Sequence, residues 1–304
     1  MSSSASSTRG DARRRWPAPC LRSRLRTWTR SSSTSTGART PPVSSRCFVA
    51  ADPLPGRVVL VTGASRGIGF EIARVLGEQG AAVIAHYGGH RAGAEEAVAA
   101  IPETDRTLVQ ADLGEPGAAR RLWGEAVGWR GRVDVLVVNA ATMPETAFEG
   151  DDEAWDSGWQ TALQVNVIEP ASLIREAVGH FRERGDGTLI TLSSWAAQRG
   201  SALPHLAAYA SSKAAIANLT QTVARNFARE GVLAHVVAPG IAHTRLSEAS
   251  LAARGGLEGV RAALAMGEMV PPVEIAELIA FLASGRCRHL TGATIDVNGA
   301  SNIR

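Results

Sequence analysis

Lysine is almost absent from this chain of 304 residues, and tyrosine and cysteine are scarce. The three scattered cysteines are too few for a disulfide framework or a zinc site, so we predict no metal, and they fit a reducing compartment. No apolar run reaches about 18 residues, which excludes a membrane-spanning helix. Apolar residues still make up 45% of the chain, enough for a sizeable core and too many for disorder throughout.

Basic charge is confined to the beginning of the chain. Residues 1–53 contain ten arginines and two acids, a net charge of +8, whereas the whole chain carries +3. The remaining residues therefore carry −5, and they form a mildly acidic domain. The basic isoelectric point thus gives no reason to expect nucleic-acid binding by the folded part.

The segment 1–53 is rich in Ser, Thr and Arg and lacks hydrophobic periodicity. This composition is typical of an organellar transit peptide, but it also fits a disordered tail or upstream sequence translated from a wrongly assigned start. We exclude the segment from the fold and assign the folded domain to 54–304. The expected location is the cytoplasm, or a plastid or mitochondrion if the segment is a transit peptide.

From Pro55 onward, short β-branched runs alternate with helical patterns. The predicted strands are Val58–Thr62, Ala82–His86, Thr107–Gln110, Val133–Asn139, Thr188–Leu192, Ala234–Ala238 and Ala293–Val297. Several are apolar nearly throughout, as strands buried on both faces should be. The alternation predicts an α/β fold: a single-domain, doubly wound, Rossmann-type parallel sheet of seven strands with helices on both faces.

A glycine-rich loop follows the first predicted strand. Residues 62–69 read Thr-Gly-Ala-Ser-Arg-Gly-Ile-Gly and lead into a helical stretch. Glycines let the backbone turn tightly and approach a pyrophosphate, and the helix N-terminus offers free N–H groups and a positive dipole end. This strand–turn–helix context favours a dinucleotide site over a turn without a ligand.

The single lysine, Lys213, lies four residues after Tyr209, one of only two tyrosines. A position that keeps lysine where all other basic residues are arginine is a functional candidate, because arginine cannot replace a compact ammonium. The spacing places both side chains on one face of a helix that we expect to run to about Arg229, about 5–6 Å apart at Cβ. The ammonium should lower the tyrosine pKa from about 10 and so fit it for proton exchange with a carbonyl oxygen.

Further motifs follow the loop in the order of one family: Ala111-Asp112-Leu113, Asn139-Ala140-Ala141, Asn166, Ser193-Ser194, Tyr209-Ala-Ser-Ser-Lys213 and Pro239-Gly240. With the TGxxxGxG pattern of the loop, they make nearly all of 55–304 resemble the short-chain dehydrogenase/reductases, most like the 3-oxoacyl-[acyl-carrier-protein] reductases. One departure is Val138-Asn139-Ala140-Ala141, where that family usually has Asn-Asn-Ala-Gly.

The resemblance implies a catalytic tetrad of Asn166, Ser194, Tyr209 and Lys213. Asn166 would hold a water of the proton relay, Ser194 would bind the substrate carbonyl, and Lys213 would also hold the nicotinamide ribose. Ser193 is an alternative to Ser194, because the gap from Ser194 to Tyr209 is longer than expected. The implied cofactor-binding residues are Gly63, Ser65, Arg66, Gly67, Ile68, Gly69, His86, Asp112 (at the adenine), Leu113, Asn139 (supporting the central strand), Ala140, Tyr209, Lys213, Pro239, Gly240, Ile241 and Thr244.

The end of the second strand bears on the choice of dinucleotide. An NAD site usually places a carboxylate there, about 20 residues beyond the glycines, to bind the ribose 2′-hydroxyl; this chain has His86. Arg66 could pair with a 2′-phosphate. In the resembled family, a basic residue just before the second glycine of the loop motif goes with NADP(H). We predict NADP(H) over NAD(H), with His90 or Arg91 assisting and a solvated loop cation as the alternative interpretation of Arg66.

The predicted activity is interconversion of a ketone and a secondary alcohol, possible substrates being a 3-oxoacyl thioester or, alternatively, an alcohol, sugar or steroid. A non-catalytic dinucleotide sensor is a further alternative, although it would be expected to lack the Tyr–Lys pair or the serine. Met143, Trp195, Leu203 and His205 are candidate pocket residues, with ordinary packing an equal alternative, and 245–270 is a candidate lid. The resemblance also implies a homodimer or homotetramer.

Overall fold

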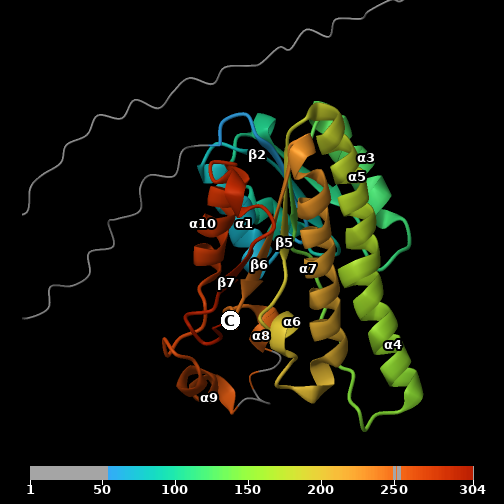
Figure 1. Ribbon diagram of the computed structural model, residues 1–304, viewed down its shortest axis with the longest axis vertical. Helices are drawn as coiled ribbons and strands as arrows, with labels where there is room; N and C mark the ends of the chain where they lie inside the picture. The colour runs from blue at the N-terminus through green and yellow to red at the C-terminus, as the bar shows by residue number, and fades with distance from the viewer. Residues whose placement is uncertain (1–53, 249–250, 252–254, 304) are drawn as a thin grey trace, which may run out of the picture. The chain divides into compact units, whose positions relative to one another are not determined.

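The computed structural model describes residues 54–248, 251 and 255–303, so the predicted leader 1–53 and part of the predicted lid lie outside the described residues. Seven strands form one parallel sheet in the order β3-β2-β1-β4-β5-β6-β7 (Figure 1). The strands are β1 (Val58–Val61), β2 (Ala82–Tyr87), β3 (Arg106–Gln110), β4 (Val135–Val138), β5 (Gly187–Leu192), β6 (Val232–Pro239) and β7 (Thr294–Val297). The predicted seven-stranded parallel sheet is confirmed, and each strand begins and ends within two residues of its prediction.

Helices connect successive strands. They are α1 (Gly67–Glu78), α2 (Arg91–Ala97), α3 (Ala118–Arg130), α4 (Asp152–Leu163), α5 (Glu169–Arg184), α6 (Ala196–Arg199), α7 (Ala207–Phe227), α8 (Arg245–Glu248), α9 (Gly256–Ala263) and α10 (Pro272–Ala283). A π-helical turn, η2 (Gln164–Ile168), joins α4 to α5, and short 3₁₀ turns lie at Glu103–Asp105, Pro204–Leu206, Ala228–Glu230 and Arg288–Leu290. Among the described residues no helix is both long and apolar enough to cross a bilayer.

Strand β1 shows why helices cover both faces of the sheet. All four of its residues are buried, and its alternate side chains enter different cores, since successive side chains of a strand point to opposite faces. Val59 and Val61 pack in the core that contains α1 and α10, whereas Val58 and Leu60 pack in the core that contains α3, α5 and α7. Figure 1 shows these two sets of helices on opposite sides of the sheet.

The strand order reverses beside β1. The chain runs outward from β1 through β2 to β3, and then returns to place β4 on the other side of β1. Ligands of open α/β sheets bind beyond the carboxyl ends of the strands at such a reversal. The carboxyl ends of β1 and β4 are therefore where a ligand site is expected.

Candidate active site

The loop after β1 is held in place by Asn139 at the end of β4. The Asn139 amide nitrogen donates to Thr62 O at 2.9 Å and to Gly63 O at 3.2 Å. Gly69 lies in the first turn of α1 and close to this loop, since a Cβ there would lie 2.1 Å from Gly63 O and 2.4 Å from Asn139 Nδ2. Only glycine fits at that position, and the Asn139 amide joins the end of β4 to the loop after β1.

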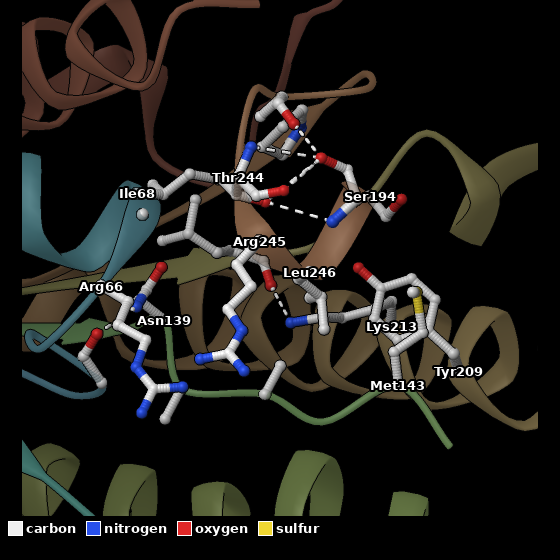
Figure 2. A pocket seen from close by; sticks show the side chains of 18 of the residues that line it. Arg66, Ile68, Asn139, Met143, Ser194, Tyr209, Lys213, Thr244, Arg245 and Leu246 are labelled. Carbon is white, nitrogen blue, oxygen red and sulfur yellow. Dashed lines mark hydrogen bonds between the residues drawn. The ribbon is translucent and has the colours of Figure 1, made fainter. Parts of the chain in front are cut away.

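Lys213 is buried on α7, with 5% of its surface exposed. Its ammonium donates to the carbonyl of Leu192, the last residue of β5, at 2.8 Å, and lies 6.0 Å from the centroid of the Tyr209 ring. Helix α7 and the carboxyl end of β5 thus meet at the Tyr–Lys pair. Figure 2 shows both side chains together with Ser194.

The expected lowering of the Tyr209 pKa is wrong. Burial raises the pKa of Tyr209, and a hydrogen bond with Ser194 lowers it only in part. Burial also lowers the pKa of Lys213 from its ordinary value of 10.5 to about 8. Desolvation therefore outweighs the attraction between ammonium and phenolate on which the expectation was based.

The two serines after β5 have different partners. The Ser193 hydroxyl donates to the backbone carbonyl of Lys213 at 2.9 Å, so it joins β5 to α7. The Ser194 hydroxyl accepts from Ala196 N at 3.2 Å and also contacts the Tyr209 hydroxyl. Of the two serines, Ser194 is therefore the one whose hydroxyl contacts Tyr209.

Asn166 lies in the π-helical turn η2, a kind of irregularity that is frequent at functional sites. Its buried side chain accepts from Thr142 N at 2.8 Å and donates to Thr142 O at 2.8 Å and to Ser212 Oγ at 3.0 Å. It thereby joins the segment after β4 to α7. The water-holding role implied for Asn166 stays a prediction, and what the structure shows is a link between the elements that carry the site.

A cavity of about 680 Å³ extends from the glycine loop to the Tyr–Lys pair. The predicted site residues that line it are Gly63, Ser65, Arg66, Gly67, Ile68, Asn139, Ala140, Ser194, Tyr209, Lys213, Pro239, Gly240, Ile241 and Thr244, joined by the pocket candidates Met143 and Trp195. The candidates Leu203 and His205 are not among its lining residues, and neither are Gly69, His86, Asp112, Leu113 and Asn166. Most of the predicted site therefore converges on one cavity at the expected edge of the sheet.

Two residues that the resemblance implied at the dinucleotide, His86 and Asp112, form hydrogen bonds with backbone groups. The His86 ring, 2% exposed, lies between Gly63 N and Ala111 O. The Asp112 carboxylate accepts from Gly114 N at 2.8 Å. His86 thus bonds to the glycine loop and is not among the residues that line the cavity.

The described residues that line the cavity include the basic side chains Arg66, His90, Lys213 and Arg245, and none of them is Asp or Glu. Figure 2 shows the Arg245 side chain between Arg66 and Lys213. Arg245 was not among the predicted site residues, although it directly follows Thr244, which was. Glycine-loop N–H groups and cations without a carboxylate suit a long, multiply anionic ligand.

Residues 63–301 match a family model described as enoyl-(acyl carrier protein) reductase. The chain belongs to the short-chain dehydrogenase/reductase family. It is 33% identical to 3beta-hydroxysteroid dehydrogenase 1 of Eggerthella lenta, over 83% of this chain and 96% of that protein. It is 32% identical to a 3-oxoacyl-[acyl-carrier-protein] reductase of Staphylococcus aureus, over 79% of this chain and 96% of that protein.

Among solved structures, a 3-oxoacyl-(acyl-carrier-protein) reductase of Agrobacterium tumefaciens with NADP bound is 31% identical, with a TM-score of 0.74 over 85% of this chain and 99% of that one. The resemblance inferred from the motifs is confirmed. This short-chain dehydrogenase/reductase is an oxidoreductase that acts on CH–OH or C=O groups.

Proposed function

We propose that this protein interconverts a ketone and a secondary alcohol with NADP(H), and that Tyr209 exchanges the proton. The observation that carries the proposal is the position of Tyr209, Ser194 and Lys213 on one part of the cavity that begins at the glycine loop. The NADP-bound relative supports the choice of a nicotinamide dinucleotide. A sensor without catalysis is disfavoured, because a binding protein has no need of a buried lysine beside a tyrosine and a serine.

The residues divide the work of reduction as follows. Lys213 and the loop that begins at Gly63 would hold a bound NADPH, and NADPH would supply a hydride. Ser194 orients the substrate oxygen by a hydrogen bond, and Tyr209 donates a proton to that oxygen. The Lys213 ammonium then stabilises the resulting phenolate, and the reverse sequence serves oxidation of an alcohol.

Arg66 supports NADP(H) over NAD(H). Arg66 is exposed in the loop and lines the cavity, and β2 ends on His86 and Tyr87 with no carboxylate to repel a 2′-phosphate. We expect Arg66→Gln to weaken NADPH binding about 10- to 100-fold and to leave NADH binding nearly unchanged, since a charge-assisted hydrogen bond is worth about 1.5–3 kcal/mol. Titration of both cofactors by fluorescence measures this.

The matched control for that experiment is Arg245→Gln. Arg245 lines the same cavity but lies on α8, near the end of β6. This variant should weaken NADPH and NADH by a similar factor, because both carry the pyrophosphate. An equal loss of NADPH and NADH in Arg66→Gln would refute the 2′-phosphate contact.

The names of two relatives suggest a substrate class for the cavity. We propose a 3-oxoacyl thioester, as the name of the Staphylococcus relative states for that protein, with a hydroxysteroid as second candidate on the name of the Eggerthella relative. Leu246 of the candidate lid and Met143 of the segment after β4 both line the cavity and would select the substrate by its shape. Steady-state kinetics with acetoacetyl thioester and with a 3-oxosteroid separate the two, since only the true substrate class should show a kcat/KM above about 10⁴ M⁻¹s⁻¹.

We also propose a homodimer or homotetramer. Three exposed apolar side chains, Phe148, Leu163 and Ile168, lie just before α4, at its end and in η2. Exposed large apolar side chains are covered when subunits associate, and we propose that these three lie in the subunit contact. Sedimentation equilibrium should therefore give a mass of two or four chains, and Ile168→Glu should shift it toward one; a monomeric wild type would contradict the proposal.

A further inference from the structure

His86 occupies the place at the end of β2 where a residue that reads the adenosine ribose is expected, yet its ring bonds to two backbone groups. Gly63 N donates to His86 Nδ1 at 3.1 Å, and His86 Nε2 lies 2.9 Å from Ala111 O. These groups belong to different segments, the glycine loop after β1 and the residue after β3. One buried ring therefore connects the carboxyl ends of three neighbouring strands.

The partners determine the protonation state of the ring. A backbone N–H can only donate, so Nδ1 must be an unprotonated acceptor; a carbonyl can only accept, so Nε2 must carry a proton. The neutral Nε2–H tautomer is the only form that satisfies both bonds. Protonation of Nδ1 would set one N–H against the N–H of Gly63.

Side chains hold both the N–H and the carbonyl group of Gly63. Its carbonyl is held by the Asn139 amide from the β4 side, and its N–H is held by His86 from the β2 side. The next residue, Ala64, donates its N–H to the His86 carbonyl at 2.8 Å. The first turn of the loop is thus fixed between two side chains, and His86 supplies one of them.

We propose that His86 is a positioning residue that holds the glycine loop in its dinucleotide-binding conformation and makes the affinity for the dinucleotide depend on pH. The inference rests on the proposed dinucleotide function of the loop. Loss of the bond to Gly63 would release the N-terminal part of the loop. The residues Ser65 to Ile68, which line the cavity, follow directly.

The surroundings of the ring favour its neutral form at neutral pH. Titratable groups on the adjoining segments are Arg66 of the loop, Tyr87, His90 and Arg91 at and beyond the end of β2, and Asp112 beyond β3. Burial lowers the pKa of His86, while the bond to Ala111 and the charge of Asp112 raise it by less. Protonation therefore sets in only below the ordinary histidine range, and the loss of affinity is expected on the acid side.

Two substitutions separate the two bonds. In His86→Asn, the amide oxygen lies at about the same distance along the side chain as Nδ1, so it can accept from Gly63 without titrating. In His86→Gln, the amide reaches about as far as Nε2 and can donate to Ala111, but Gly63 N loses its acceptor. The asparagine variant thus tests titration, and the glutamine variant tests the Gly63 bond.

The experiment is calorimetric titration of the full chain and both variants with NADP⁺ between pH 8 and pH 5. At pH 8 we expect His86→Asn to bind within about twofold of wild type and His86→Gln to bind about tenfold more weakly, since an unsatisfied buried N–H is costly. Toward pH 5 the wild type should lose affinity at least about threefold more than His86→Asn. Titration of the 2′-phosphate itself is common to both proteins and cancels in this comparison.

Parallel pH profiles of wild type and His86→Asn would overturn the inference while leaving the dinucleotide function intact, whether or not the glutamine variant folds. Absence of NADP⁺ binding by the wild type at pH 8 would overturn the proposed function, and the inference with it. Thermal unfolding of each variant at pH 8 identifies a loss of affinity that comes from unfolding.

Discussion

Tyr209→Phe is expected to lower ketone reduction by about 10²- to 10⁴-fold, the range that a positioned general acid contributes, with NADPH binding unchanged. Phenylalanine keeps the ring that packs beside Lys213 and removes only the hydroxyl that contacts Ser194. Stopped-flow measurement of NADPH oxidation at saturating substrate, together with a binding titration, records both effects.

The other tyrosine of the chain provides the matched control. Tyr87 is buried, its hydroxyl accepts from Arg91 Nη1 at 3.2 Å, and it is not among the residues that line the cavity. Tyr87→Phe should therefore keep nearly full activity. If Tyr209→Phe turned over ketone as fast as Tyr87→Phe, the assignment of Tyr209 as proton donor would be wrong.

Lys213→Met is expected to abolish most activity and, at the same time, to make the protein more stable at pH 7. The ammonium is needed to stabilise a Tyr209 phenolate, so its loss should lower turnover by about 10²-fold or more. Burial lowers the pKa of Lys213 from 10.5 to about 8, which means that the folded protein binds the proton less well than the unfolded chain does. That difference costs stability wherever the unfolded chain is protonated.

The sign and the pH window of the stability effect follow from those two values. Above pH 10.5 the lysine is neutral in both states and costs nothing; between pH 10.5 and 8 the cost develops, and below pH 8 it is fully present. Each pKa unit corresponds to about 1.4 kcal/mol, and the Leu192 carbonyl left without its donor offsets about 1 kcal/mol. We therefore expect Lys213→Met to gain about 1–3 kcal/mol at pH 7 and less at pH 9.5.

Urea unfolding at pH 7 and pH 9.5 measures this gain. Arg225→Met is the control, because Arg225 is an exposed cation on the same helix. It should change the free energy of unfolding by less than about 0.5 kcal/mol at both pH values. A Lys213→Met protein less stable than wild type at pH 7 would show that the ammonium is well solvated or paired, against the burial seen here.

The fold was predictable from the sequence because its signals are local. Runs such as Val58–Val61 are apolar throughout, and the glycine loop directly after that strand marks where the sheet binds a ligand. The Tyr–Lys pair could be placed on one helix face because its spacing of four is a property of the helix itself.

The parts that escaped prediction depend on contacts between distant segments. The raised pKa of Tyr209 comes from burial, which spacing along a helix does not report. His86 bonds to residues 23 and 25 positions away on two other segments, so no local pattern distinguishes it from a ribose contact. The same holds for Asn166, whose side chain bonds to Thr142 and Ser212.

The central claim is that Tyr209 and Lys213 serve reduction of a ketone by NADPH. The most direct test is to incubate the full chain with NADPH and acetoacetyl thioester and to quantify NADPH at 340 nm and the alcohol product by mass spectrometry. We expect one alcohol formed for each NADPH consumed, a faster reaction with NADPH than with NADH, and at least about 10²-fold slower product formation by Tyr209→Phe. Tight binding of NADPH without consumption, with this thioester and with a 3-oxosteroid alike, would contradict it.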